Sequence, residues 1–209
     1  MAVITISREL GSEGDKIADI LCDKLGYCRV DKAVLAQIAE EAGVDIKAIL
    51  AQEQAVANRP RLISDQMTSL YGRQPTAFRK KAAVDDQTYE RVVRETMERF
   101  AKEGNAVIVG RGGQMVLRDW PTALHVQLYA PVEVRVERLM VRHGISELEA
   151  KRRIAASDEQ KRMSIRNIHK NANWKDLKHY HLAINTGAIA AEVTADIILQ
   201  AARHREHAQ

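Results

Sequence analysis

Residues 3–26 read VITISRELGSEGDKIADILCDKLG and define the start of the fold. Residues 3–6 form a short β-branched run, which is typical of a buried strand. After a loop that contains glycine, apolar residues recur at helical spacing until Gly26 supplies a C-terminal stop. The stretch therefore predicts a strand, a loop and a helix in direct succession.

The rest of the chain repeats this alternation of strands and helices. Further strands are predicted at residues 27–30, 106–109, 124–129 and 182–185, and helices at 32–57 (interrupted near Gly43), 85–102, 132–142, 146–169 and 189–202. The run 106–109 is apolar on both faces, as in parallel strands that helices cover on both sides. These elements predict an α/β fold with a five-stranded parallel sheet, flanked by helices and joined by right-handed crossovers.

Composition excludes several classes of protein. The chain of 209 residues is 45% hydrophobic and has a net charge of +4, as an ordinary globular protein does. No stretch of 18 apolar residues occurs, so no membrane-spanning helix is expected. The first residues, MAVITISREL, lack the features of a secretory signal, which predicts a cytoplasmic protein. Cys22 and Cys28 form no C-x-x-C pair, so neither a disulfide framework nor a zinc site is indicated.

Two basic segments stand out against the mild overall charge. Residues 151–170 carry seven basic and two acidic side chains, and residues 59–81 carry six basic side chains and Asp65. Two such segments can converge on one polyanion. Nucleic acid is not the expected partner, because aromatic residues make up only 4% of the chain and platforms for base stacking are scarce.

Three loops with glycine follow predicted strands, at residues 7–16, 110–113 and 185–187. In open parallel sheets, ligands bind beyond the carboxyl ends of the strands. The loop at 7–16 stands before a helix N-terminus, whose free amide groups attract anions. It lacks the G-x-x-x-x-G-K-[ST] pattern, and its net charge is −1. Ser12 and Asp15 fit a capping box, so this loop by itself favours a purely structural interpretation.

Arginines offer a second signal for phosphate binding. Arg111 lies between glycines, which let the backbone approach a ligand while the guanidinium binds a phosphate; a solvated arginine in a turn is the alternative. Asp158, Arg162, Arg166 and Lys170 are spaced by four residues, hence on one helix face, where Asp158 can pair with Arg162. This face is either solvated or supplies the cations that phosphoryl transfer requires.

Several motifs together resemble the cytidylate-kinase-like family, relatives of the nucleoside monophosphate kinases in the P-loop class. They are ITISRELGSEGDKIA, LGYCRVDK, VIVGRGGQMVLRD, LHVQLYAPVEVRVERLMVRHGISELEA, SDEQKR, NWKD and YHLAINTG. The resemblance implies a single domain over residues 1–209 with a three-layer α/β/α core. The expected core covers about 1–57, 84–145 and 171–209, with an insertion that binds the monophosphate at about 58–83 and a lid at about 146–170.

The resemblance also implies an activity and its residues. We expect transfer of the γ-phosphoryl group of ATP to a nucleoside monophosphate such as CMP or dCMP, with Mg²⁺. The residues that hold ATP would be Arg8, Gly11, Ser12, Gly14 and Lys16. Asp31 and Arg111 would bind the acceptor, and Arg162, Arg166 and Lys16 would act in the transfer step.

The phosphate loop departs from the family pattern. The lysine of authentic cytidylate kinases falls on Gly14, and Lys16 lies two residues later. Glu13 and Asp15 would oppose a triphosphate unless they turn outward or meet a cation. A catalytically inactive nucleotide-binding or regulatory protein is therefore the alternative, and nucleic-acid binding is a third reading. The sequence leaves open the identity of the acceptor, the motion of the lid and a homo-oligomer.

Overall fold

The computed structural model describes residues 2–41, 77–169 and 172–207. Its elements in chain order are β1 (Val3–Arg8), α1 (Gly14–Leu25), β2 (Cys28–Val30), α2 (Lys32–Glu41), α4 (Ala77–Glu103), β3 (Ala106–Val109), α5 (Gly113–Val116), β4 (Ala123–Tyr129), α6 (Val132–His143), α7 (Glu147–Ile168), the 3-10 helix η1 (Leu177–His179), β5 (Leu182–Asn185) and α8 (Ala191–His207).

The five strands form one parallel sheet in the order β2-β3-β1-β4-β5. The predicted five-stranded parallel sheet is therefore confirmed. Strand β1 lies at its centre, where Val3 is paired with both Ala106 of β3 and Ala123 of β4. The loop that follows β1 consequently lies at the middle of the sheet's carboxyl edge, next to the loops that follow both neighbouring strands.

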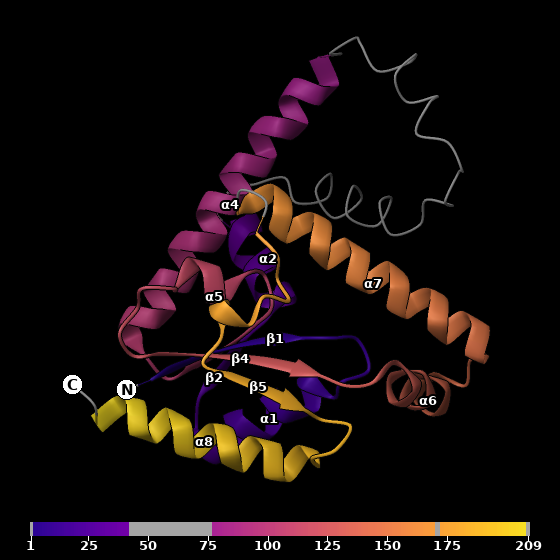
Figure 1. The fold of residues 1–209 in the computed structure, drawn as a ribbon. Coiled ribbons are helices and arrows are strands. Elements are labelled where there is room, and N and C mark those ends of the chain that lie inside the picture. Colours follow the sequence, from indigo (N-terminus) through magenta and orange to yellow (C-terminus); the bar gives the residue numbers. More distant parts are fainter. Residues whose placement is uncertain (1, 42–76, 170–171, 208–209) are drawn as a thin grey trace.

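Helices cover both faces of the sheet, as the predicted three-layer architecture requires (Figure 1). One buried cluster joins Ile4 and Ile6 of β1 to residues of α1 and α8. A second cluster joins Val3 of the same strand to residues of α2 and α4. Because side chains alternate along a strand, Val3 and Ile4 of β1 point to opposite faces of the sheet, so this strand supplies both layers of the core.

Helix α6 lies beyond the carboxyl edge of the sheet, and α7 runs from there back toward α2 and α4 (Figure 1). Val136 and Leu139 of α6 pack on Ala150 and Ile154 of α7, and Leu10 of the first loop packs against the same cluster. The two helices thereby form a cover next to the loop that follows β1.

Helix α4 corrects one predicted boundary. It begins at Ala77, not at residue 85, so residues 77–83 of the predicted insertion belong to this helix. Their sequence, AFRKKAA, has no apolar period but is rich in residues with high helix propensity. Residues 58–76 of the insertion, and the predicted helix beyond Glu41, lie outside the described residues. The short helix α5 was not predicted, because four residues carry no period.

The helices of the described part of the chain include none that combines the length and the apolar character needed to cross a membrane.

A buried histidine lies within the sheet, away from the carboxyl edge. His125 of β4 is in register with Thr5 of β1, and its Nδ1 lies 2.8 Å from the Thr5 hydroxyl. Its Nε2 lies 3.1 Å from the carbonyl oxygen of Leu117, which can only accept, so Nε2 carries the proton. The ring stacks on His181 with centroids 4.8 Å apart. Burial, and then the neighbouring His181, lower the pKa of His125 to about 4.

We expect this histidine to make the fold acid-sensitive. The unfolded chain binds the proton below pH ~6.5 while the folded chain does not until about pH 4, so stability falls across that window by about 3 kcal/mol. Urea denaturation at several pH values measures this slope. His125→Gln should reduce this slope and leave the part that comes from His169 and His181, whose pKa values are also lowered. His143→Gln, at an exposed position of α6, should not reduce it. Equal slopes in the wild type and His125→Gln would contradict the assignment.

Candidate functional site

Two clefts open at the carboxyl edge of the sheet. The large cleft has a volume of about 870 Å³ and lies between the first loop, the start of α1, and helices α6 and α7. The small cleft, of about 50 Å³, lies between β1, the loop at 110–113, α7 and Trp174. Arg8 and Lys161 line both clefts. The two clefts therefore adjoin, and two cationic side chains mark their junction.

Arg8 extends from the first glycine loop to the second. A Cβ atom added at Gly14 would lie 2.5 Å from the Cβ of Arg8, and one added at Gly110 would collide with the guanidinium nitrogen Nη1. Both positions therefore require glycine while Arg8 keeps this conformation.

The loop does not use the predicted capping box. The N-cap of α1 is Glu13, in the left-handed conformation with φ 56°, and its side chain caps no amide. The Ser12 hydroxyl is buried and donates to the carbonyl oxygen of Glu9 at 2.8 Å, so the predicted pairing of Ser12 with Asp15 is wrong. The first-turn amides of a helix that no side chain caps are available to an anion.

Two arginines of α6 fix the outer side of this loop. Arg135 Nε donates to the carbonyl oxygen of Leu10 at 2.7 Å, and Arg138 Nη1 donates to that of Gly11 at 3.2 Å. Arg138 Nη2 also donates to the carbonyl oxygen of Thr186, at 2.7 Å, in the loop that follows β5. The loop's carbonyls are thereby held by guanidinium groups, and the loops after β1 and β5 are joined.

The acidic side chains of the loop each meet a cation. Glu13 Oε2 lies 3.0 Å from Arg138 Nη2, and Asp15 Oδ1 lies 2.9 Å from Arg29 Nη2 and 3.6 Å from Arg8 Nη2. The net negative charge predicted from the loop is therefore offset by arginines from β1, β2 and α6. At this loop, a polyanion would therefore meet ion pairs and not isolated carboxylates.

Arg135 is the centre of a buried ion-pair network. Its side chain is 5% exposed and lies 3.2 Å from Glu9 and 2.9 Å from Asp158 of α7. Lys175 Nζ binds the same two carboxylates, at 2.6 Å and 3.3 Å. Burial opposes ionisation of Asp158, but the hydrogen bonds and charges of Arg135 and Lys175 outweigh it and lower the pKa of that carboxyl. The network joins the first loop, α6 and α7.

Most residues predicted to hold ATP lie at the large cleft. Arg8, Gly11, Gly14 and Lys16 line it, whereas Ser12 is fully buried beneath the loop. Lys16 Nζ pairs with Glu192 of α8 at 2.8 Å, and that contact raises the pKa of Lys16. Arg111 lines the small cleft.

The remaining predicted residues do not line either cleft. Asp31 accepts a hydrogen bond from the amide of Ala33 at 2.9 Å and pairs with Arg29, so it caps α2. Arg162 and Arg166 are exposed on α7. Arg162 pairs with Glu159 at 2.6 Å, so the pair of Asp158 and Arg162 that their spacing predicts is wrong.

Lys161 was missed by the sequence analysis, although a signal for it exists. Ile154, Asp158, Lys161 and Ile165 are spaced by four, three and four residues, which places them on one face of α7. Ile154 and Ile165 are buried, so this face points into the protein. The spacing of four residues from Asp158 predicted Arg162 as the functional residue, but Arg162 lies beside the buried face and is exposed.

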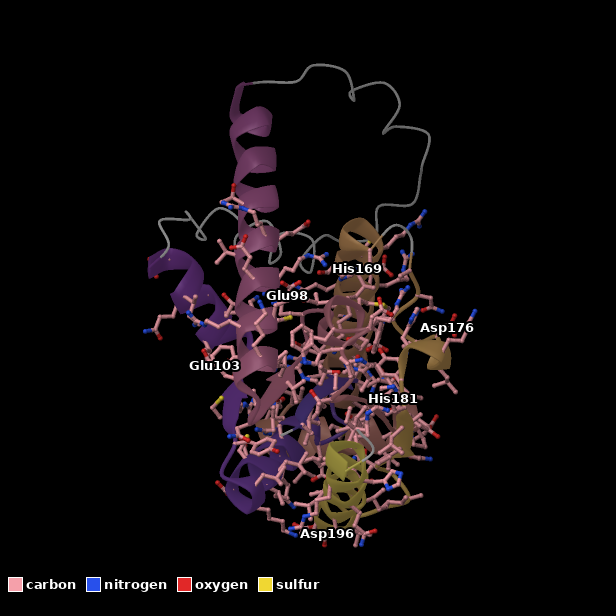
Figure 2. All side chains as sticks on the ribbon, turned by 90° about the vertical axis from the view of Figure 1, so that its left-hand side faces the viewer. Glu98, Glu103, His169, Asp176, His181 and Asp196 are labelled. Carbon is pink, nitrogen blue, oxygen red and sulfur yellow. The ribbon has the colours of Figure 1, made fainter. Side chains whose placement is uncertain are left out.

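His169 packs against the glycine loop at residues 110–113, which lines the small cleft. Its Nε2 lies 2.8 Å from the place where a Cβ of Gly112 would stand, and Figure 2 shows this histidine at the end of α7. Burial, followed by the charge of Arg94 and Arg118, lowers the pKa of His169 to about 4. A neutral imidazole therefore packs on the backbone of Gly112, where no larger residue would fit.

The described residues contain no group of three or more His, Cys, Asp or Glu side chains that could hold a metal ion. Asp15 and Asp19 line the large cleft, but Arg29 binds both carboxylates. The described part of the chain thus offers cations and amides to an anion and no prepared cage for a metal.

Comparison with known proteins agrees with this architecture. The model of the cytidylate kinase-like family matches residues 3–188. The cytidylate kinase of Pyrococcus horikoshii is 35% identical over 143 residues, which cover 68% of this chain and 72% of that protein.

Two solved structures share the fold. An uncharacterized protein from Eubacterium ventriosum has a TM-score of 0.70 at 19% identity and covers 97% of this chain and 99% of its own. The shikimate kinase from Acinetobacter baumannii in complex with shikimate has a TM-score of 0.51 at 18% identity and covers 99% and 96%. At these identities the likeness concerns the fold alone.

The buried network at Arg135 should dominate the stability of the site. Arg135→Met leaves two buried carboxylates with Lys175 as their remaining partner, and we expect a loss of about 3 kcal/mol in the free energy of unfolding. Chemical denaturation measures it. Arg142→Met, on an exposed position of the same helix, should change stability by less than about 0.5 kcal/mol. Equal stabilities of the two variants would show that the network is not structural.

Proposed function

This chain belongs to the cytidylate kinase-like family, and we propose that it transfers the γ-phosphoryl group of ATP to a nucleoside monophosphate such as CMP or dCMP. The observation that carries the proposal is the junction of the two clefts at Arg8 and Lys161. Phosphoryl transfer needs a donor and an acceptor phosphate held in line, with cations where charge develops. Two adjoining clefts with shared cations meet that need.

The large cleft is suited to the triphosphate of ATP. Its volume lies within the range of ~300–1,000 Å³ that is usual for small-molecule sites. The first turn of α1 offers uncapped amides, and Arg8, Arg138 and Lys16 offer positive charge at its wall. Val134 and Val141 of α6 add apolar surface against which a base can pack.

The small cleft is suited to the phosphate of the acceptor. Gly110, Arg111 and Gly112 all have positive φ angles of 54–82°, a conformation that glycine adopts without strain. This backbone lets a phosphate approach closely, while the Arg111 guanidinium can bind its oxygens in two places. The base of the acceptor is selected elsewhere, since a volume of about 50 Å³ admits little more than a phosphate group.

The reaction balances without a protein nucleophile. The bond between the γ-phosphorus and the bridging oxygen of the β-phosphate breaks, and a bond forms between the γ-phosphorus and an oxygen of the acceptor phosphate. ADP and a nucleoside diphosphate result. The acceptor phosphate has a second pKa of ~6, so at neutral pH its oxygen attacks without a general base. The protein's part is to position the two phosphates and to stabilise negative charge.

Mg²⁺ fits this scheme as an ion that arrives with the nucleotide. Magnesium is usually held by substrate phosphates together with one or two carboxylates. Among the carboxylates that line the large cleft, Asp15 and Asp19 are bound by Arg29. The described residues contain no group of three or more His, Cys, Asp or Glu side chains that could hold a metal ion. Bound to the phosphates, the ion would screen their charge.

Gly14 favours a second candidate function. Without a lysine at this position, the fold can bind a nucleotide yet leave the transfer unassisted, as in an inactive or regulatory protein. Binding without turnover separates this candidate from the first.

An assay of ADP formation from ATP and CMP, with and without Mg²⁺, tests the proposal. We expect turnover in the wild type, and a fall of at least 100-fold in kcat/KM in Arg8→Ala and Arg111→Ala, because each removes a guanidinium that contacts phosphate. Lys151→Ala is the control, since that exposed lysine of α7 pairs with Glu147. Calorimetric binding of ATP without ADP formation would support the inactive protein. Retention of oligonucleotides without affinity for mononucleotides would support a nucleic-acid-binding protein.

Arg162 and Arg166 line neither cleft, and Arg162 can act in the transfer step only if it leaves Glu159 when nucleotides bind. We propose that it does. Arg162→Ala should then lower kcat at least tenfold and leave the denaturation midpoint unchanged, since the side chain is exposed. Glu159→Gln, which weakens the competing ion pair, should not lower kcat. Wild-type kcat in both Arg162→Ala and Arg166→Ala would restrict the machinery to the side chains that line the clefts.

A further inference from the structure

Among the described residues of α7, Lys161 is the one that lines both clefts. Ser157 lines the large cleft alone, and Ile165 lines the small cleft alone. Lys161 lies on the inward face of the helix, between buried Ile154 and Ile165. Its ammonium is thus held at the junction of the clefts by a regular helix that packs on α6.

The surroundings of Lys161 leave its charge without a carboxylate partner of its own. Nζ donates to the hydroxyl of Ser157 at 3.1 Å, and it lies 5.6 Å from the centre of the Trp174 ring. Asp158 and Glu9 are the acids whose charge reaches it, and both are bound by other cations. A half-buried ammonium that relies on a hydroxyl and a ring is costly unless an anion arrives.

We propose that Lys161 is the phosphate-binding lysine of this protein, and that its ammonium holds the terminal phosphates of ATP at the junction of the clefts. The inference rests on the proposed function and assigns to α7 the task that a lysine in the first loop would perform. A lysine cannot stand at position 14, because Arg8 fills the room that its Cβ would need. Lys16 is turned toward Glu192.

A specific pH dependence follows from the proposed role. Burial and then the charge of Arg8 lower the pKa of Lys161 to about 8 in the free protein. The charged groups that act on it are Arg8 and Glu9 from the first loop, Arg135 from α6 and Asp158 from its own helix. Only the protonated amine attracts phosphate, so affinity for ATP should be full below about pH 8 and should decline as the pH rises through that value.

Calorimetric titration with ATP at pH 7 and pH 9, without an acceptor, tests the role. Wild-type affinity should fall about tenfold between the two values, because the protonated fraction of a group with a pKa of about 8 falls by that factor. Lys161→Arg should bind tightly at both pH values, since a guanidinium stays charged. Lys161→Met should bind at least tenfold more weakly than the wild type at pH 7 and should lose the pH dependence.

Lys151→Met is the matched control, because it removes an exposed lysine of the same helix that pairs with Glu147. It should bind ATP as the wild type does. Denaturation midpoints of Lys161→Met should be no lower than those of the wild type, which separates loss of phosphate binding from loss of folding. Equal ATP affinity of Lys161→Met and the wild type at pH 7 would overturn the inference.

The binding measurement needs no turnover, so it fails independently of the proposed function. A wild type that forms no ADP with CMP but shows the expected pattern of ATP affinity would refute the kinase activity and support the role of Lys161. A wild type that turns over while Lys161→Met binds ATP equally well would support the activity and refute that role.

Discussion

The site depends on two arginines of α6 whose guanidinium groups donate hydrogen bonds to the first loop. Arg135 and Arg138 lie one turn apart, so both reach the same side of the loop. They bind the carbonyl oxygens of Leu10 and Gly11, and they also neutralise acidic side chains. Backbone shape and charge balance are therefore set by the same contacts. Because Arg135 also binds Asp158, the position of α7 is coupled to the shape of the loop.

The positive charge around this loop is distributed differently from that around a loop with its own lysine. Here the loop is acidic and receives its cations from β1, β2 and α6, through Arg8, Arg29 and Arg138. Each acid of the loop offsets part of an arginine's charge, so the number of basic residues overstates the positive charge available to a ligand. The cations that line the junction of the clefts matter more than the total.

The sequence predicted the sheet well, because parallel strands buried on both faces are continuous apolar runs such as residues 106–109. It placed the start of α4 eight residues late, since propensity without an apolar period is a weaker signal. The sequence analysis also assigned Arg162, and not Lys161, to the transfer step. Spacing from Asp158 allowed both, and only the buried Ile154 and Ile165 show which face points inward. Ser12 failed as a cap because Glu13, in a left-handed conformation, takes that position.

The lack of a lysine at position 14 is tied to the presence of Arg8 at the end of β1. Arg8 at the end of β1 packs its stem against Gly14, so a side chain at 14 and the present conformation of Arg8 exclude each other. Arg8 is the last residue of β1 and is in register with Leu128 of β4, so its backbone belongs to the sheet and not to the loop. The absence of the loop lysine therefore does not by itself remove positive charge from the phosphate site; it changes which element must supply it.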